Sequence, residues 1–164
     1  MENPLFRTFS DVSWQALKCK ASDSSRLRAH FNLHRSYNDA IQKTLICILK
    51  GSYIPPHFHR HAHQKELFVV LQGKVKVIFF ERNGVIRDNV FLEQGGFIEI
   101  TPYSIHSVVC LSEFANVLEI KSGPFTESDS KEFLEWTIEE GEEQADRYLA
   151  WLESASAGER FGEI

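Results

Sequence analysis

Four histidines alternate with other residues inside one segment, GSYIPPHFHRHAHQKELFVVLQG, which spans residues 51–73. The histidines of this segment and the acidic residue that follows them are His57, His59, His61, His63 and Glu66. Side chains two positions apart in an extended chain point to the same face, with Cα atoms about 7 Å apart. Two such imidazoles can reach one ion at about 2.1 Å. The pattern therefore indicates a site for a divalent metal ion.

The four histidines cannot all bind the same ion in an extended chain. His57 and His63 would lie about 20 Å apart. The spacing instead favours one adjacent pair of histidines together with Glu66, which returns on the next strand. A carboxylate at the start of an apolar strand is costly unless it is paired or bound to a metal. We therefore expect Glu66 to be a ligand and the remaining histidines to lie in a solvated loop.

The composition indicates one globular domain and argues against several classes of partner. The chain has 164 residues, a net charge of −5 and no block of lysines or arginines, which argues against nucleic acid. Its apolar runs have the length of strands, so no membrane-spanning helix is predicted. Three widely spaced cysteines argue against a disulfide framework, and no signal peptide is evident. We therefore expect a cytoplasmic protein.

Short apolar segments with regular turn signals predict an antiparallel β-barrel or sandwich. The expected strands cover residues 44–56, 66–71, 74–81, 85–92, 97–101, 106–111 and 116–123. Asn83-Gly84 predicts a type I′ hairpin turn, in which both central residues have positive φ. The expected helices cover residues 10–21, 26–30, 128–136 and 142–153, with Ser128 or Asp129 as the cap of the third.

No linker divides the chain, so the segments should belong to one domain. Residues 1–42 are expected to form a helical and loop segment packed on the barrel, and residues 43–124 the barrel itself. Residues 125–153 should form the C-terminal helices, and residues 154–164 a loose tail.

Two motifs resemble those of the cupin superfamily. They are Gly51-x5-His57-x-His59 with Glu66-x6-Gly73, and Gly95-x5-Thr101-Pro102-Tyr103-x2-His106. The resemblance implies a mainly β fold, the cupin jelly-roll barrel (a double-stranded β-helix), with short N-terminal and C-terminal helices. It also implies a metal ion inside the barrel, with the ligands His57, His59, Glu66 and His106. Cupins usually have proline at position 101 and glycine at position 103 of this second motif.

The spacing of the first motif leaves two pairs of ligands open. The general cupin pattern has three or four residues before the glutamate, whereas six separate His59 from Glu66. Counting back from Glu66 selects His59 and His61, and counting forward from the first glycine selects His57 and His59. We prefer the second pair, because Pro55-Pro56 anchors the start of the strand and a longer loop is easily accommodated. His61 is the alternate ligand.

Segments outside the motifs narrow the resemblance to the WbuC-type cupin-fold metalloproteins. They are Arg26-Leu27-Arg28, Phe31-Asn32-Leu33-His34, Gly51-Ser52-Tyr53, Leu118-Glu119-Ile120-Lys121, Gly123-Pro124 and Tyr148-Leu149-Ala150-Trp151-Leu152. The resemblance covers about residues 10–152, nearly the whole chain. Proteins of this kind are met in bacterial surface-polysaccharide (O-antigen) gene clusters, which implies a role in lipopolysaccharide biosynthesis.

The same resemblance implies a pocket for a small molecule at the barrel mouth. Its candidate residues are Arg28, Asn32, His34, Tyr53, Glu119 and Lys121. Glu119 and Lys121 share one face of a strand, which is either an exposed face or an interior polar pair. Family behaviour also implies a homodimer.

Three imidazoles and one carboxylate leave one or two positions open on a five- or six-coordinate ion. Zn²⁺, Fe²⁺, Mn²⁺ and Ni²⁺ all accept such ligands. The ion could polarise a substrate oxygen or make a water nucleophilic, and Fe²⁺ could activate O₂. We expect a metal-binding protein that acts on or binds a sugar or nucleotide-sugar in polysaccharide biosynthesis. The alternatives are an iron-dependent small-molecule dioxygenase and a non-catalytic sugar-binding or regulatory protein.

Overall fold

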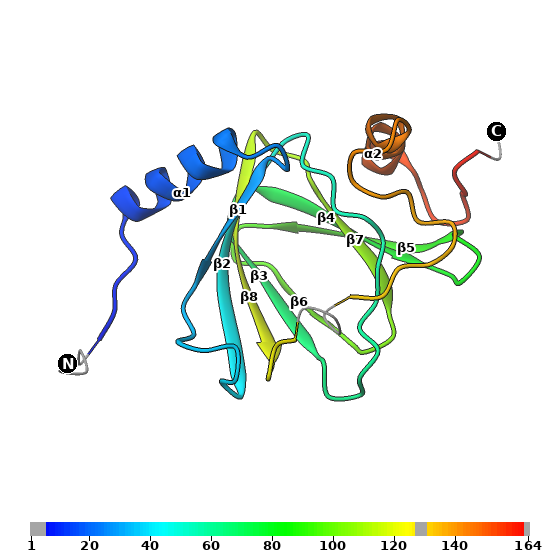
Figure 1. The fold of residues 1–164 in the computed structure, drawn as a ribbon. Helices are drawn as coiled ribbons and strands as arrows, with labels where there is room; N and C mark the ends of the chain where they lie inside the picture. The colour runs from blue at the N-terminus through cyan, green and yellow to red at the C-terminus, as the bar shows by residue number, and fades with distance from the viewer. Residues whose placement is uncertain (1–5, 127–130, 163–164) are drawn as a thin grey trace.

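Two antiparallel β-sheets face each other and enclose a common core (Figure 1). The computed structural model describes residues 6–126 and 131–162. One sheet has the strand order β1-β2-β8-β3-β6, and the other has the order β5-β4-β7. The strands are β1 (Arg28–Asn32), β2 (Ile41–Leu49), β3 (Glu66–Gln72), β4 (Lys74–Phe80), β5 (Ile86–Glu93), β6 (Phe97–Ile100), β7 (Ile105–Cys110) and β8 (Phe114–Ser122). This arrangement confirms the predicted antiparallel barrel.

The inner face of the five-stranded sheet changes from apolar to polar along its strands. On β8, Ala115 and Val117 belong to the buried apolar core. Glu119 and Lys121 follow them on the same face, because side chains alternate along a strand. The register places Glu66 of β3 directly opposite Lys121. One end of the barrel is therefore a packed core, and the other end carries charged groups.

The helix α1 (Asp11–Asp23) covers the outer face of β1 and β2 (Figure 1). Its Leu17 and Ala21 are buried against Leu45 and Cys47 of β2. The helix begins after Ser10, a residue type that is favoured at helix N-termini. The helix predicted over residues 10–21 is confirmed.

The helix α2 (Ala145–Ser154) packs on the outer face of the three-stranded sheet. Tyr148, Leu149 and Leu152 are buried there, as the sequence predicts. Lys76 of β4 ties the end of this helix to the sheet, since its buried Nζ donates to the carbonyls of Leu152 (2.8 Å) and Ala155 (2.6 Å). The last carbonyls of a helix lack partners within it, so the lysine supplies both hydrogen bonds and a favourable charge.

Residues 26–30 do not form the predicted helical turn. Leu27 has a φ of 52°, and β1 begins at the next residue. The strand pairs with β2 from Arg28 opposite Ile48 to Asn32 opposite Thr44. The prediction is wrong because the free edge of β2 offers hydrogen bonds that a local pattern does not reveal.

The hairpin predicted at Asn83-Gly84 is confirmed, but its turn differs. The amide of Gly84 donates to the carbonyl of Glu81 at 3.0 Å, and the amide of Glu81 donates to the carbonyl of Val85 at 2.8 Å. Gly84 has a φ of 86°, whereas Asn83 is not among the described residues with positive φ. A type I′ turn needs positive φ at both positions, so this turn is of another type.

Residues 131–140, which we call the strap, run alongside the segment that leads to the histidines. Glu132 and Phe58 exchange two backbone hydrogen bonds, of 2.9 and 3.0 Å. Further along the strap, the hydroxyl of Tyr53 donates to the carbonyl of Ile138 at 2.7 Å. The strap is thereby fastened beside the histidines, although it follows β8 in the chain.

The helix predicted over residues 128–136 is wrong in its described part, because the backbone of Glu132 bonds to Phe58 instead of to its own neighbours. Its expected caps, Ser128 and Asp129, lie outside the described residues. The next helix predicted by the sequence is present as α2.

Replacing Lys76 by methionine keeps a long buried side chain but removes the donor to two carbonyls. We expect Lys76→Met to lower the free energy of unfolding by about 2 kcal/mol, because the buried carbonyl of Leu152 would lose its side-chain donor, which costs about 1–3 kcal/mol. The carbonyl of Ala155 would keep the hydrogen bond that the side-chain amide of Asn89 donates at 3.0 Å. Urea unfolding followed by circular dichroism measures the change.

The matched control is Lys74→Met, because among the described residues Lys74 forms its ion pair with the exposed Glu93 alone, at 2.8 Å. It should change the free energy of unfolding by less than about 1 kcal/mol. Equal losses in the two variants would contradict the role of Lys76.

Candidate metal centre

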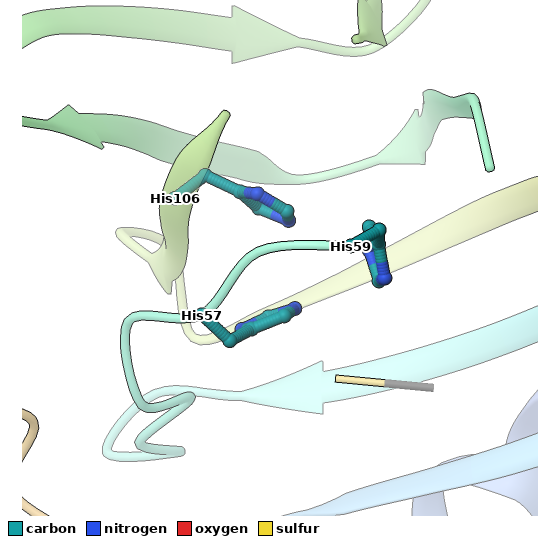
Figure 2. Close-up of side chains that lie close together, drawn as sticks. All are labelled: His57, His59 and His106. Carbon is teal, nitrogen blue, oxygen red and sulfur yellow. The ribbon is translucent and has the colours of Figure 1, made fainter. Parts of the chain in front are cut away.

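Three histidines converge inside the polar end of the barrel (Figure 2). One ligand atom from each of His57, His59 and His106 lies within 4.8 Å of the others. All three side chains are buried, with residue exposures of 2–4%. Among the described residues, these form the group that could hold a metal ion.

Backbone hydrogen bonds bring the two histidine segments together. His57 and His106 exchange two of them: the amide of His57 donates at 3.0 Å and that of His106 at 2.8 Å. The amide of Tyr103 donates to the carbonyl of His59 at 2.9 Å. Directly opposed residues of an antiparallel pair have their side chains on one face. The imidazoles of His57 and His106 consequently meet, with ring centroids 4.5 Å apart.

The rings of His57 and His106 are held by carbonyls. Nδ1 of His57 lies 2.8 Å from the carbonyl oxygen of Pro55, and Nδ1 of His106 lies 2.9 Å from that of Ser104. A carbonyl can only accept, so each Nδ1 carries the proton and each Nε2 keeps its lone pair. Hydrogen bonds of this kind orient histidines that bind metals.

The charge state of His57 also suits a ligand. Burial lowers the pKa of His57 well below its usual value, and the positive charge of Lys131 acts in the same direction. The imidazole is therefore neutral near pH 7, which is the form that binds a metal ion.

Glu66 brings a carboxylate to the same centre. Its Oε2 lies 3.0 Å from Nε2 of His59 and 3.5 Å from Nε2 of His106. Two ligand atoms that are both 2.1 Å from one ion, at octahedral or tetrahedral angles, are about 3.0–3.4 Å apart. The donor set and its spacing therefore fit one divalent cation.

Glu66 stays ionised although it is buried. Burial alone would raise its pKa, but the positive charge of Lys121 opposes that effect, and the pKa of Glu66 is held well below the usual value. A negative carboxylate beside neutral imidazoles is the ligand form that a divalent cation requires.

Glu119 and Lys121 form an interior polar pair, which decides between the two readings that the sequence left open. Nζ of Lys121 lies 3.0 Å from Oε1 of Glu119 and 3.4 Å from Oε1 of Glu66. Burial raises the pKa of Glu119 to about 7, although Lys121 opposes the shift. The carboxylates of Glu119 and Glu66 share one lysine, so the histidine cluster continues into a partly buried network of charges.

The other residues expected in the pocket divide into two groups. Arg28 is buried, but its guanidinium donates to Ser52, to the carbonyl of Tyr53 and to Glu140, so it fastens the strap. Tyr53 does the same through its hydroxyl. These two side chains therefore have structural partners and do not reach the histidines.

Asn32 and His34 lie at the open edge of the five-stranded sheet. Asn32 is exposed and accepts a long hydrogen bond from Thr44, at 3.4 Å. Nδ1 of His34 accepts from the amide of Lys43 at 3.1 Å. Asn32 pairs with Thr44, and Thr44 pairs with Glu119, so Asn32 and Glu119 share the inner face of the sheet. His34 is not part of the cluster of His57, His59 and His106.

Sequence reasoning missed His30 and Lys131. His30 lies between Arg28 and Asn32 on the inner face of β1, at the exposed mouth of the barrel. Partial desolvation there lowers its pKa to about 4. The alternation of polar residues in RAHFN could have identified His30, had the segment been predicted as a strand. No signal in the sequence points to Lys131, because its position depends on the strap.

The remaining histidines of the first segment lie outside the cluster. His61 is half-buried and His63 is exposed, and their rings stack with centroids 5.5 Å apart. The geometry therefore groups His57 with His59, while the alternate ligand His61 is not part of the group of three.

Tyr103 has a φ of 68°. The amide of Ser104 donates to the carbonyl of Thr101 at 3.3 Å, which closes a turn with Pro102 and Tyr103 at its centre. Proline followed by a residue with positive φ is typical of a type II turn, where glycine is the usual third residue. Tyrosine here costs on the order of 1 kcal/mol, which explains why glycine would be expected at this position of the motif.

Two hollows lie near the centre. One, of about 30 Å³, adjoins His59 and Lys121 and has room for about one water. The other, of about 520 Å³, is open and is lined in part by Phe79 and Tyr103. Its volume is in the range of small-molecule sites, and the ring of Phe79 lies 6.5 Å from that of His106.

Comparison with known proteins gives one family match and several structural matches. Residues 9–92 match a family model described as "Domain of unknown function (DUF6016)". A variant of oxalate decarboxylase from Bacillus subtilis is similar, with a TM-score of 0.52 and 16% identity, over 65% of this chain and 28% of that chain. Lactobacillus farciminis oxalate decarboxylase in complex with formate has a TM-score of 0.50 and 17% identity, over 63% and 30%. A cupin superfamily protein from Desulfitobacterium hafniense has a TM-score of 0.48 and 17% identity, over 58% and 76%.

The similarities to the two oxalate decarboxylases establish the fold, which is the cupin barrel that the two motifs imply. At identities of 16% and 17% they carry no information about the reaction. No curated protein matches the sequence. Within residues 6–126 and 131–162, no helix is long and apolar enough to cross a membrane.

Proposed function

The chain belongs to the family described as "Domain of unknown function (DUF6016)", and we propose that it is a metalloprotein of the cupin fold. In this proposal His57, His59, Glu66 and His106 hold one divalent cation. The observation that carries it is the convergence of three buried imidazoles with an ionised carboxylate, at separations that one ion would span. Zn²⁺, Fe²⁺, Mn²⁺ and Ni²⁺ all suit these ligands.

A divalent cation bound there would act as a Lewis acid on a ligand oxygen. The chain itself would orient the ligands, through the carbonyls of Pro55 and Ser104, and exclude water by burying the three imidazoles. Glu119 would be able to hold or release a proton near neutral pH, because burial raises its pKa to about 7. This combination would support either catalysis or the binding of a polar small molecule.

We further propose that the ligand is a sugar or nucleotide-sugar of bacterial surface-polysaccharide synthesis. The support is the sequence resemblance to WbuC-type cupins over about residues 10–152. The pocket residues Asn32, Glu119 and Lys121 share the inner face of the sheet, as that resemblance would require. Metal-loaded protein should bind or convert nucleotide-sugars in a turnover and titration assay, and iron-dependent O₂ uptake without such binding would favour the dioxygenase alternative.

A cytoplasmic location and a homodimer belong to the same proposal. Cys19, Cys47 and Cys110 are free thiols, as a reducing compartment favours. The outer face of β3 and β6 carries the exposed side chains Leu71 and Phe97, which a second copy could cover. Sedimentation equilibrium measures the oligomeric state, and a monomer at all concentrations would contradict the homodimer.

Loss of one imidazole should remove the metal. We expect His106→Ala to weaken metal binding at least about tenfold. The loss of a residue that only hydrogen-bonds to a metal ligand already costs about 10–100-fold in metal affinity. Metal analysis of protein purified without chelators measures the stoichiometry, and circular dichroism checks the fold.

His63→Ala is the matched control, because His63 is an exposed histidine of the same segment. It should retain the metal at the wild-type level. Equal metal content in wild type and His106→Ala would refute the proposed ligand set.

Metal retention should also fall between pH 8 and pH 5, because protons compete with the ion for the imidazole nitrogens. Dialysis at each pH followed by metal analysis measures the effect. Retention that stays constant over this range would mean that imidazoles are not the ligands.

A further inference from the structure

We propose that the ligand of this metal centre carries an acidic group, a carboxylate or a phosphate, which Lys131 of the strap binds. This inference rests on the proposed metal site and names the chemical class of what that site receives. It follows from the orientation of Lys131, its electrostatic surroundings and the balance of buried charges.

The pairing of the strap places Lys131 on the histidine side. Phe58 and Glu132 are directly opposed, and Glu132 forms an ion pair with Arg60. Side chains alternate along paired strands, so the neighbours Lys131 and Phe133 point the other way, together with the imidazoles on either side of Phe58. The ring of Phe133 indeed lies 6.4 Å from the ring of His57.

In an antiparallel pairing centred on Phe58 and Glu132, His59 lies opposite Lys131 and His57 opposite Phe133. Opposed side chains on one face have Cβ atoms about 5 Å apart. The amino group of Lys131 is therefore within reach of a molecule bound beside the histidines.

The charges around Lys131 agree with the inward orientation that the pairing gives it. Burial lowers its pKa to about 8, and the positive charge of Lys121 acts in the same direction, whereas Glu119 and Glu66 oppose the shift. The charge of Lys131 in turn contributes to the lowered pKa of His57. Lys131 thus belongs to the electrostatic environment of the centre.

The interior cations differ in whether they already have a partner. Lys121 is paired with both Glu66 and Glu119, and Arg28 is paired with Glu140. Lys131 forms neither a hydrogen bond nor an ion pair with any other described residue. It is therefore the interior cation that is available to a ligand.

A bound dication would leave the interior with an excess of positive charge. Even with Glu119 fully ionised, the two carboxylates, Glu66 and Glu119, would offset only the two lysines, Lys121 and Lys131. Excess charge in a buried site is costly unless a counter-charge enters. A ligand oxygen on the metal and an acidic group on Lys131 would supply that counter-charge, with charge-assisted hydrogen bonds.

Calorimetric titration of the zinc-loaded protein, dialysed free of excess metal, tests the inference. The probes are inorganic phosphate and succinate, with glucose as the uncharged comparison. We expect at least one anion to bind and glucose to bind more weakly. Lys131→Gln should lower the affinity for that anion about tenfold or more. Tighter binding of phosphate would identify a phosphate group in the ligand, and tighter binding of succinate would identify a carboxylate.

Two variants control for charge and for general effects. Lys131→Arg keeps the charge and should bind within about threefold of wild type. Lys20→Gln removes an exposed lysine of α1 and should change nothing. Zinc content should be equal in all of these proteins, because Lys131 is not a metal ligand.

Equal anion affinity in wild type and Lys131→Gln would overturn the inference, as would zinc-loaded wild type that binds neither anion. A failure of the proposed metal site can be distinguished from a failure of this inference, because the wild-type protein would then retain no zinc. The same titration of the metal-free protein would in that case decide the role of Lys131: anion binding that Lys131→Gln removes would support it, and no such loss would overturn it.

Discussion

The backbone pairing between His57 and His106 is the interaction on which the candidate metal centre depends. Its two hydrogen bonds, of 3.0 and 2.8 Å, join the loop before β3 to the start of β7. Each of these histidines is then oriented by the carbonyl two residues before it, Pro55 in one case and Ser104 in the other. The same local hydrogen bond therefore orients both imidazole rings, and the backbone pairing brings the two oriented histidines together.

The barrel tolerates charges at this end because they compensate one another. Lys121 lies between Glu66 and Glu119 and contacts both carboxylates. The pKa values of the carboxylates move apart, with Glu66 held low and Glu119 raised to about 7, because burial disfavours two negative charges that share one cation. The apolar end of the same sheet supplies the packed core, so function and stability occupy different halves of the strands.

The strap connects the end of the chain to this centre. Its backbone pairs with Phe58, and its ion pair with Arg28 uses a side chain that the sequence had suggested for ligand binding. A residue in a pocket motif can thus have a structural role, while a lysine from an unremarked segment turns toward the site.

By itself, the sequence determined the features that depend on neighbours in the chain. Alternating apolar residues predicted the strands of the barrel, and the two helices follow local patterns. The resemblance to cupin motifs suggested His57, His59, Glu66 and His106 as ligands and left His61 as the alternate. Only the tertiary structure decided that residues 28–32 form an edge strand, that the strap is irregular, and that the strand register places His30 and Lys131 on the inner side. These features depend on hydrogen bonds to distant segments, β2 and Phe58, and no local pattern encodes a partner that lies far away in the sequence.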